Sequence, residues 1–141
     1  EGNPRSHASP FARIMERGLA RRLVQVGVRT WNKHNRAQAR RFGVEVVEWA
    51  DFTPATVPIP TGPLYVTIDL DALDPAFAPG VSHPEPGGLS VRDIVAVIAR
   101  IRTQVVGADV VELNPAHDTG DATAIVAVKL IKELMGAMAR R

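Results

Sequence analysis

The 141 residues suit a single domain. With 45% hydrophobic and 23% charged residues they have the composition of a folded globular protein, which excludes a disordered chain. The absence of cysteine excludes disulfides and thiolate metal sites, and no apolar run is long enough to span a membrane. The net charge of +2 divides unevenly, with ten basic and four acidic residues in 1–50 against seven basic and eleven acidic in 51–141.

Strands and helices alternate along the chain. In chain order we expect a helix beginning after Ser9, a strand over 23–29, a helix over 33–41, strands over 44–49 and 64–70, a helix from Ser90 to Ile101, a strand over 105–113 and a helix over 122–139. The predicted helix caps are Ser9, Asn32, Gly43, and Ser90 with Asp93 in a capping box. The basic residues of the first half recur at helical spacing and lack interleaved aromatic residues, which is typical of a solvated helix face. We therefore expect no nucleic-acid partner.

Apolar strands separated by helices predict an α/β fold, a three-layer parallel sheet with helices on both faces. In such sheets ligands bind beyond the carboxyl ends of the strands. Asp69 and Asp71 follow one predicted strand and Glu112 follows another. Two residues apart in extended backbone, Asp69 and Asp71 would point to the same side, where a hard divalent cation could neutralise them. By itself, an Asp-x-Asp pair is more typical of a turn cap than of a metal site.

The pair lies within a longer motif. Segment 67–80 reads Thr-Ile-Asp-Leu-Asp-Ala-Leu-Asp-Pro-Ala-Phe-Ala-Pro-Gly, and Pro84, Pro86, Gly87 and Gly88 follow it. It closely resembles the signature of the ureohydrolases, the family of arginase and agmatinase. Segments 6–11 and 110–115 resemble two further motifs of that family, in the family's order. The chain is thereby identified as a single partial ureohydrolase domain over 1–141, with the arginase-like fold and its N-terminal part missing.

The resemblance implies a binuclear Mn²⁺ centre that hydrolyses the C–N bond of a guanidino compound, a linear amidine, to urea and an amine. Asp69 matches a carboxylate that bridges both ions, and Asp71 matches a ligand of one ion. His7 matches a catalytic histidine that shuttles protons, and Glu112 matches the residue that binds the guanidinium. His34, His83 and His117 match no ligand position.

The family's other metal ligands come from a Gly-Gly-x-His-type and an Asp-Ala-His-x-Asp segment, which precede the motif of 6–11 and do not occur here. We therefore expect the polypeptide to continue upstream, and the 141 residues alone to bind Mn²⁺ weakly and to be inactive. A second hypothesis is a non-catalytic remnant that acts as an association module, because missing strands leave sheet edges and apolar faces uncovered.

Segments 83–90 and 110–115 look most like bacterial agmatinases, which favours agmatine, cleaved to putrescine and urea, over the substrates of an arginase or a guanidinobutyrase. Agmatine carries two positive charges, which suits the acidic balance of 51–141. Glu85 and Asp118 are candidates for a place near its far amine, although their loop positions are more typical of solvated carboxylates. We expect a small cationic guanidino substrate, a homo-oligomer and no membrane partner. We also expect a cytoplasmic location, because the first residues lack the apolar core of a signal peptide.

Overall fold

The computed structural model describes residues 3 and 5–140 and contains the predicted elements in the predicted order. The helices are α1 (Pro10–Glu16), α2 (Lys33–Phe42), α3 (Val91–Arg100) and α4 (Ala122–Ala139). The strands are β1 (Val24–Val28), β2 (Glu45–Glu48), β3 (Leu64–Asp69) and β4 (Val105–Val111). Two 3-10 turns, η1 (Trp49–Asp51) and η2 (Leu70–Ala72), follow β2 and β3.

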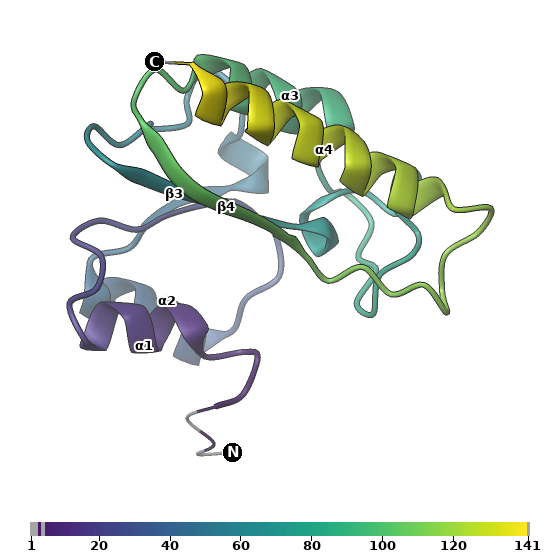
Figure 1. Ribbon diagram of the computed structural model, residues 1–141. Coiled ribbons are helices and arrows are strands. Elements are labelled where there is room, and N and C mark those ends of the chain that lie inside the picture. The colour runs from purple at the N-terminus through teal and green to yellow at the C-terminus, as the bar shows by residue number, and fades with distance from the viewer. Residues whose placement is uncertain (1–2, 4, 141) are drawn as a thin grey trace.

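The strands pair in parallel, as predicted for an α/β fold, but they form two separate two-stranded sheets, β1–β2 and β3–β4. Helices lie on both sides of the β3–β4 sheet, with α3 and α4 packed together above it and α1 and α2 below (Figure 1). The three layers of the predicted fold are therefore present. Both β3–β4 strands run in the same direction, so their carboxyl ends meet at one edge.

Three of the four predicted helix caps are confirmed. The Asn32 side chain accepts the amide of Asn35 at 3.0 Å, and Gly43 ends α2 in the left-handed region at φ 63°. Ser90 and Asp93 form the reciprocal capping box at the start of α3. The prediction for Ser9 was wrong, because its hydroxyl donates to the Ser6 carbonyl at 2.9 Å instead of capping α1.

The hydrophobic core belongs to the C-terminal half. It lies between the β3–β4 sheet, the loop that follows β3, and the inner faces of α3 and α4. Its members are Ile68, Leu70, Leu73, Ala78, Val81, Leu89, Ile94, Ile98, Ile101, Val105, Ala127, Leu130, Leu134 and Ala137. Among the described residues before position 57, only Gly27 is buried. The loop after β3 thus contributes Leu73, Ala78, Val81 and Leu89 to the core.

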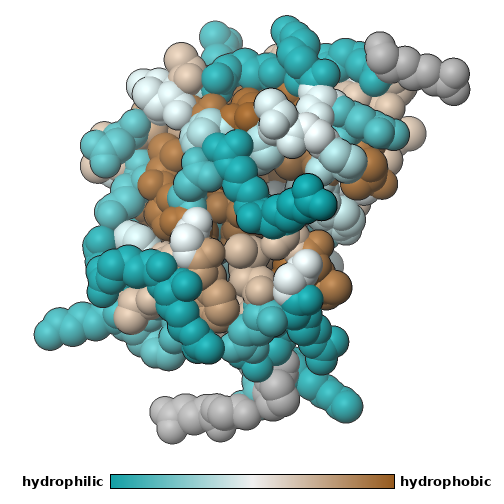
Figure 2. Space-filling model, turned by 90° about the vertical axis from the view of Figure 1, so that its left-hand side faces the viewer, coloured by the Kyte–Doolittle hydropathy of each residue, from teal (hydrophilic) through white to brown (hydrophobic). Residues whose placement is uncertain are grey.

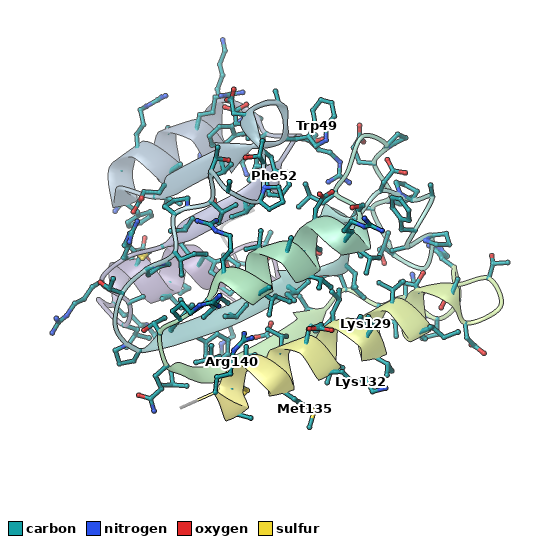
Figure 3. The ribbon with its side chains drawn as sticks, turned by 90° about the horizontal axis from the view of Figure 1, so that it is seen from above. Trp49, Phe52, Lys129, Lys132, Met135 and Arg140 are labelled. Carbon is teal, nitrogen blue, oxygen red and sulfur yellow. The ribbon has the colours of Figure 1, made fainter. Side chains whose placement is uncertain are left out.

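Helix α4 is apolar on a second face as well. Beside the buried face, Ile125 (65% exposed), Val128, Ile131, Met135 (63%) and Met138 remain open to solvent. Figure 3 shows Lys132 and Met135 on the outer side of α4, and Figure 2 shows apolar side chains still visible between polar ones on another side of the molecule. None of the helices in the described part of the chain combines the length and apolarity needed to cross a membrane.

Candidate active site

The predicted carboxylates gather where β3 and β4 end. Asp69 is the last residue of β3 and is the register partner of Val111, the last residue of β4. Glu112 follows Val111 directly, and Asp71 lies in the turn η2 just beyond β3. Because the two strands are parallel, Asp69, Asp71 and Glu112 share one edge of the sheet, as the sequence predicted.

The local backbone of the Asp pair differs from the prediction. The chain is extended only as far as Asp69, and Asp71 lies within a 3-10 turn rather than on a continued strand. The Asp69 carboxylate accepts the amide of Asp71 through Oδ1 at 2.8 Å, so Asp69 caps the turn that carries Asp71. The turn-cap interpretation of an Asp-x-Asp pair is therefore correct here, and it brings the two carboxylates together without an extended backbone.

The three carboxylates influence one another. Desolvation raises the pKa of Asp69, and repulsion from Asp71 and Glu112 raises it further, while the Asp71 amide and the Arg29 cation oppose these effects. Desolvation and repulsion from Glu112 likewise raise the pKa of Asp71, against the lowering effects of His83 and Arg29. The Oδ1 atom of Asp71 is buried without a hydrogen-bond partner among the described residues. The edge thus holds several carboxylates close together, and none of the ion pairs found among residues 3 and 5–140 involves them.

Glu112 has an unusual backbone conformation. Its φ of 71° lies in the left-handed region, which residues other than glycine seldom adopt. Such strain persists only where the surrounding structure imposes it, and it is concentrated at functional sites. At this position the turn changes the course of the chain as it leaves β4 while keeping Glu112 at the edge that carries the two aspartates.

The loop after η2 is braced by Asp74. Its carboxylate accepts the amides of Ala76 (2.9 Å), Gly87 (2.7 Å) and Gly88 (3.2 Å), and these bonds lower the pKa of Asp74. Gly88 is required for close approach, because a Cβ atom there would lie 2.4 Å from the Asp74 nitrogen. Sequence reasoning missed the role of Asp74, although an Asp-Pro dipeptide is a signal for a turn.

Asp118 has a structural role that differs from the prediction. Its carboxylate accepts the amides of Thr119 (3.0 Å), Thr123 (2.9 Å) and Ala124 (3.0 Å), so it caps the start of α4. Desolvation opposes ionisation, but these bonds outweigh it and lower the pKa of Asp118. This capping role was not foreseen from the sequence, and the placement of Asp118 near the far amine of a substrate stays a prediction. Glu85 is exposed, and its carbonyl accepts two hydrogen bonds from Arg29.

The two histidines considered for this site, His7 and His83, are both exposed. His7 is exposed in the turn before α1, and no hydrogen bond or ion pair found within residues 3 and 5–140 joins it to Asp69, Asp71 or Glu112. Its catalytic role stays a prediction. His83 is exposed in the loop near Asp71 and lowers the pKa of that carboxyl.

The donors at this edge suit part of a site for a hard divalent cation. Carboxylate oxygens are the ligands that Mg²⁺ and Mn²⁺ prefer, and the buried, unpartnered Oδ1 of Asp71 is an available donor. Within the described residues, however, no group of three or more His, Cys, Asp or Glu side chains could enclose a metal ion. Two open grooves of about 500 and 550 Å³ lie elsewhere. One is beside Trp49 and Phe52, which Figure 3 labels, and the other is between α1 and α2. Asp69 and Asp71 therefore fit a metal site that needs further ligands.

Comparison with known proteins identifies the family to which a chain with this acidic edge belongs. The model of the arginase family matches residues 1–136. The chain belongs to the arginase family. It is 53% identical to arginase 1, mitochondrial, of Arabidopsis thaliana, 38% to a guanidinopropionase of Pseudomonas aeruginosa and 33% to an agmatinase of Bacillus cereus.

These relatives are much longer than the chain. The alignments cover 99%, 97% and 96% of this chain, but only 43%, 48% and 49% of the respective relatives. The arginase of Medicago truncatula superposes with a TM-score of 0.89 at 50% identity, covering 97% of this chain and 46% of that one. The family and the arginase-like fold predicted from the motifs are thus confirmed, and the chain spans less than half the length of the relatives it matches.

Proposed function

We propose that the protein containing these 141 residues hydrolyses a small cationic guanidino compound to urea and an amine with the help of two Mn²⁺ ions. The observation that carries the proposal is the meeting of Asp69, Asp71 and Glu112 at the carboxyl edge, in a chain of the arginase family. When bound, a pair of such ions supplies a nucleophile from water at neutral pH. The 141 residues provide two of the carboxylate ligands, and the rest of the protein has to provide the others.

Each residue has a distinct part in this proposal. Asp69 and Asp71 would help to hold the ions, Asp69 as a ligand for both and Asp71 as a ligand for one. Glu112 accepts hydrogen bonds from the guanidinium, and charge-assisted bonds of this kind fix its plane and orientation. His7 delivers a proton to the leaving amine, a general-acid role for which an imidazole is suited because its ring nitrogens can both donate and accept a proton.

For the substrate we put L-arginine first. The relatives with identities of 48–53% are arginases, whereas the agmatinase is 33% identical, so the preference for agmatine drawn from the motifs is not confirmed. The electrostatic reason for agmatine is also weaker, since Asp118 is engaged in capping α4. Agmatine remains the alternative substrate.

Urea release by the complete protein loaded with Mn²⁺ tests both the hydrolytic function and the order of the substrates. We expect kcat/KM for arginine to exceed that for agmatine, 4-guanidinobutyrate and 3-guanidinopropionate by about 10-fold or more, equivalent to roughly 1.4 kcal/mol. Glu112→Gln should lower kcat/KM by about 10- to 100-fold for every substrate, through the loss of a charged hydrogen-bond acceptor. Asp69→Asn should lower it by more than about 100-fold, and Asp51→Asn on η1 serves as the matched control. Faster turnover of agmatine would reverse the substrate order, and no urea from any of them would refute the function.

Self-association is the second candidate role. The exposed apolar side chains Ile125, Val128, Met135 and Met138 on α4 support it, because apolar patches on a surface favour contacts with other protein. We propose that a second copy of the chain covers this face. Association through α4 and hydrolysis at the carboxyl edge use different surfaces, so the two roles are compatible.

A further inference from the structure

Arg29 links two distant parts of the chain at the carboxyl edge. It follows the last residue of β1, and its guanidinium donates only to main-chain carbonyls in the hydrogen bonds found. Nη2 donates to Asp71 O at 2.7 Å and to Glu85 O at 2.6 Å, Nε to Glu85 O at 3.0 Å, and Nη1 to Ala72 O at 3.3 Å. A longer contact at 3.4 Å reaches Leu73 O. These partners lie 42 to 56 residues away in sequence.

Arg29 donates to carbonyl groups although two carboxylates lie nearby. Arg29 is close enough to lower the pKa of both Asp69 and Asp71, yet no ion pair found among the described residues joins it to a carboxylate. In the described part of the chain, the Oδ1 atom of Asp71 has no hydrogen-bond partner. A cation paired directly with these oxygens would compete with any other cation for them. Held on carbonyl groups, Arg29 moderates the repulsion between the carboxylates without occupying the Oδ1 atom of Asp71.

The same bonds fix the position of Asp71. Two of the acceptors, Asp71 O and Ala72 O, belong to the turn η2, and Glu85 O belongs to the far side of the loop after it. The guanidinium therefore holds the turn, the loop and the end of β1 in one arrangement. Close to it, a Cβ at Gly27 would lie 2.9 Å from Leu89 Cδ1, so β1 also approaches the loop closely. Planar donors in a fixed fork suit several carbonyls at once, which a lysine ammonium cannot match.

We propose that Arg29 is a positioning residue, which locks the turn carrying Asp71 to the loop containing Glu85 so that the Oδ1 atom of Asp71 is presented to a divalent cation. The part about the cation rests on the proposed function. The part about the turn and the loop rests on the hydrogen bonds of Arg29 alone, so the two can fail separately.

Hydrogen exchange on the 141-residue chain tests the locking. We expect Arg29→Met to speed exchange at the amides of Leu73, Asp74 and Gly87 by about 10-fold or more, with little change in β4 or α4. Arg29→Lys should show most of this increase, and it replaces the methionine variant if that fails to fold. The matched control is Arg22→Met at the other end of β1, where the arginine makes an exposed ion pair with Glu45. Unchanged exchange in the turn, or an equal increase across all strands, would overturn the locking role.

Mn²⁺ binding by the complete protein, followed by calorimetry or electron paramagnetic resonance, tests the presentation of Asp71. Arg29→Met and Arg29→Lys should weaken binding by about 10- to 100-fold, the range found for residues that orient a metal ligand, while Arg22→Met leaves it unchanged. At saturating Mn²⁺, most of the activity should return with KM for the substrate unaltered. Wild-type affinity in both Arg29 variants would overturn the proposal. A complete wild-type protein that binds no Mn²⁺ would refute the proposed function and this arm, but would leave the locking to be judged by hydrogen exchange.

Discussion

The buried contact between the loop after β3 and the start of α4 yields a quantitative prediction. Thr123 is fully buried, and its hydroxyl oxygen accepts the amide of Gly80 at 2.7 Å. Valine has nearly the same shape, so Thr123→Val removes the acceptor without opening a cavity. The Gly80 amide would then be buried without a partner, which costs about 1–3 kcal/mol. For a chain of this size we expect the melting temperature to fall by roughly 3 °C for each kcal/mol lost.

Urea denaturation and hydrogen exchange measure this effect. Thr123→Val should lower the denaturation midpoint and abolish the protection of the Gly80 amide, whereas Thr123→Ser should retain that protection because it keeps the hydroxyl. Thr119→Val, an exposed change of the same kind in the adjacent loop, should stay within about 0.5 kcal/mol of the wild type. A valine variant as stable as the wild type, or one in which Gly80 remains protected, would show that the amide has another acceptor and would refute the reasoning.

Four more predictions follow from other parts of the molecule. Calorimetric titration of the 141-residue chain should detect only weak Mn²⁺ binding, and tight binding of two ions would contradict the incomplete ligand set. Gly88→Ala should disorder the braced loop by pushing on the Asp74 backbone, seen as faster exchange of the loop amides but not of the α4 amides. Asp118→Asn should destabilise the chain at pH 7. Because the pKa of Asp118 is lowered on folding, its contribution exists above the unfolded pKa and is lost as the pH falls, so the urea midpoints of variant and wild type should converge in acid. Sedimentation should show self-association of the wild type that Met135→Lys weakens and Ala99→Lys, on the exposed side of α3, does not; a monomer at all concentrations would remove α4 as an interface.

The rule that parallel strands end at one edge of a sheet predicted only part of the candidate site. Asp69, Asp71 and Glu112 could be grouped from the sequence because parallel strands bring their carboxyl ends to one edge, whatever the details of the loops. The backbone that joins Asp69 to Asp71 could not be predicted in the same way. It depends on β3 ending at Asp69 and on the burial of Leu70 and Leu73 in the core, which shapes the turn that follows. The substrate was beyond reach for a different reason, because the chain spans less than half the length of its relatives.

The sequence by itself determined the order of the elements, the parallel α/β class and most helix caps, such as Asn32 and Ser90. These signals act over a few residues: a capping side chain reaches its own first turn, and hydrophobic periodicity is set by the local backbone. Only the tertiary structure decided that Arg29 holds the turn of Asp71, and that Asp118 caps α4. The contact of Arg29 joins residues 42 positions apart. For Asp118 the sequence favoured a solvated loop carboxylate, and the bonds to the start of α4 depend on how the loop before that helix folds.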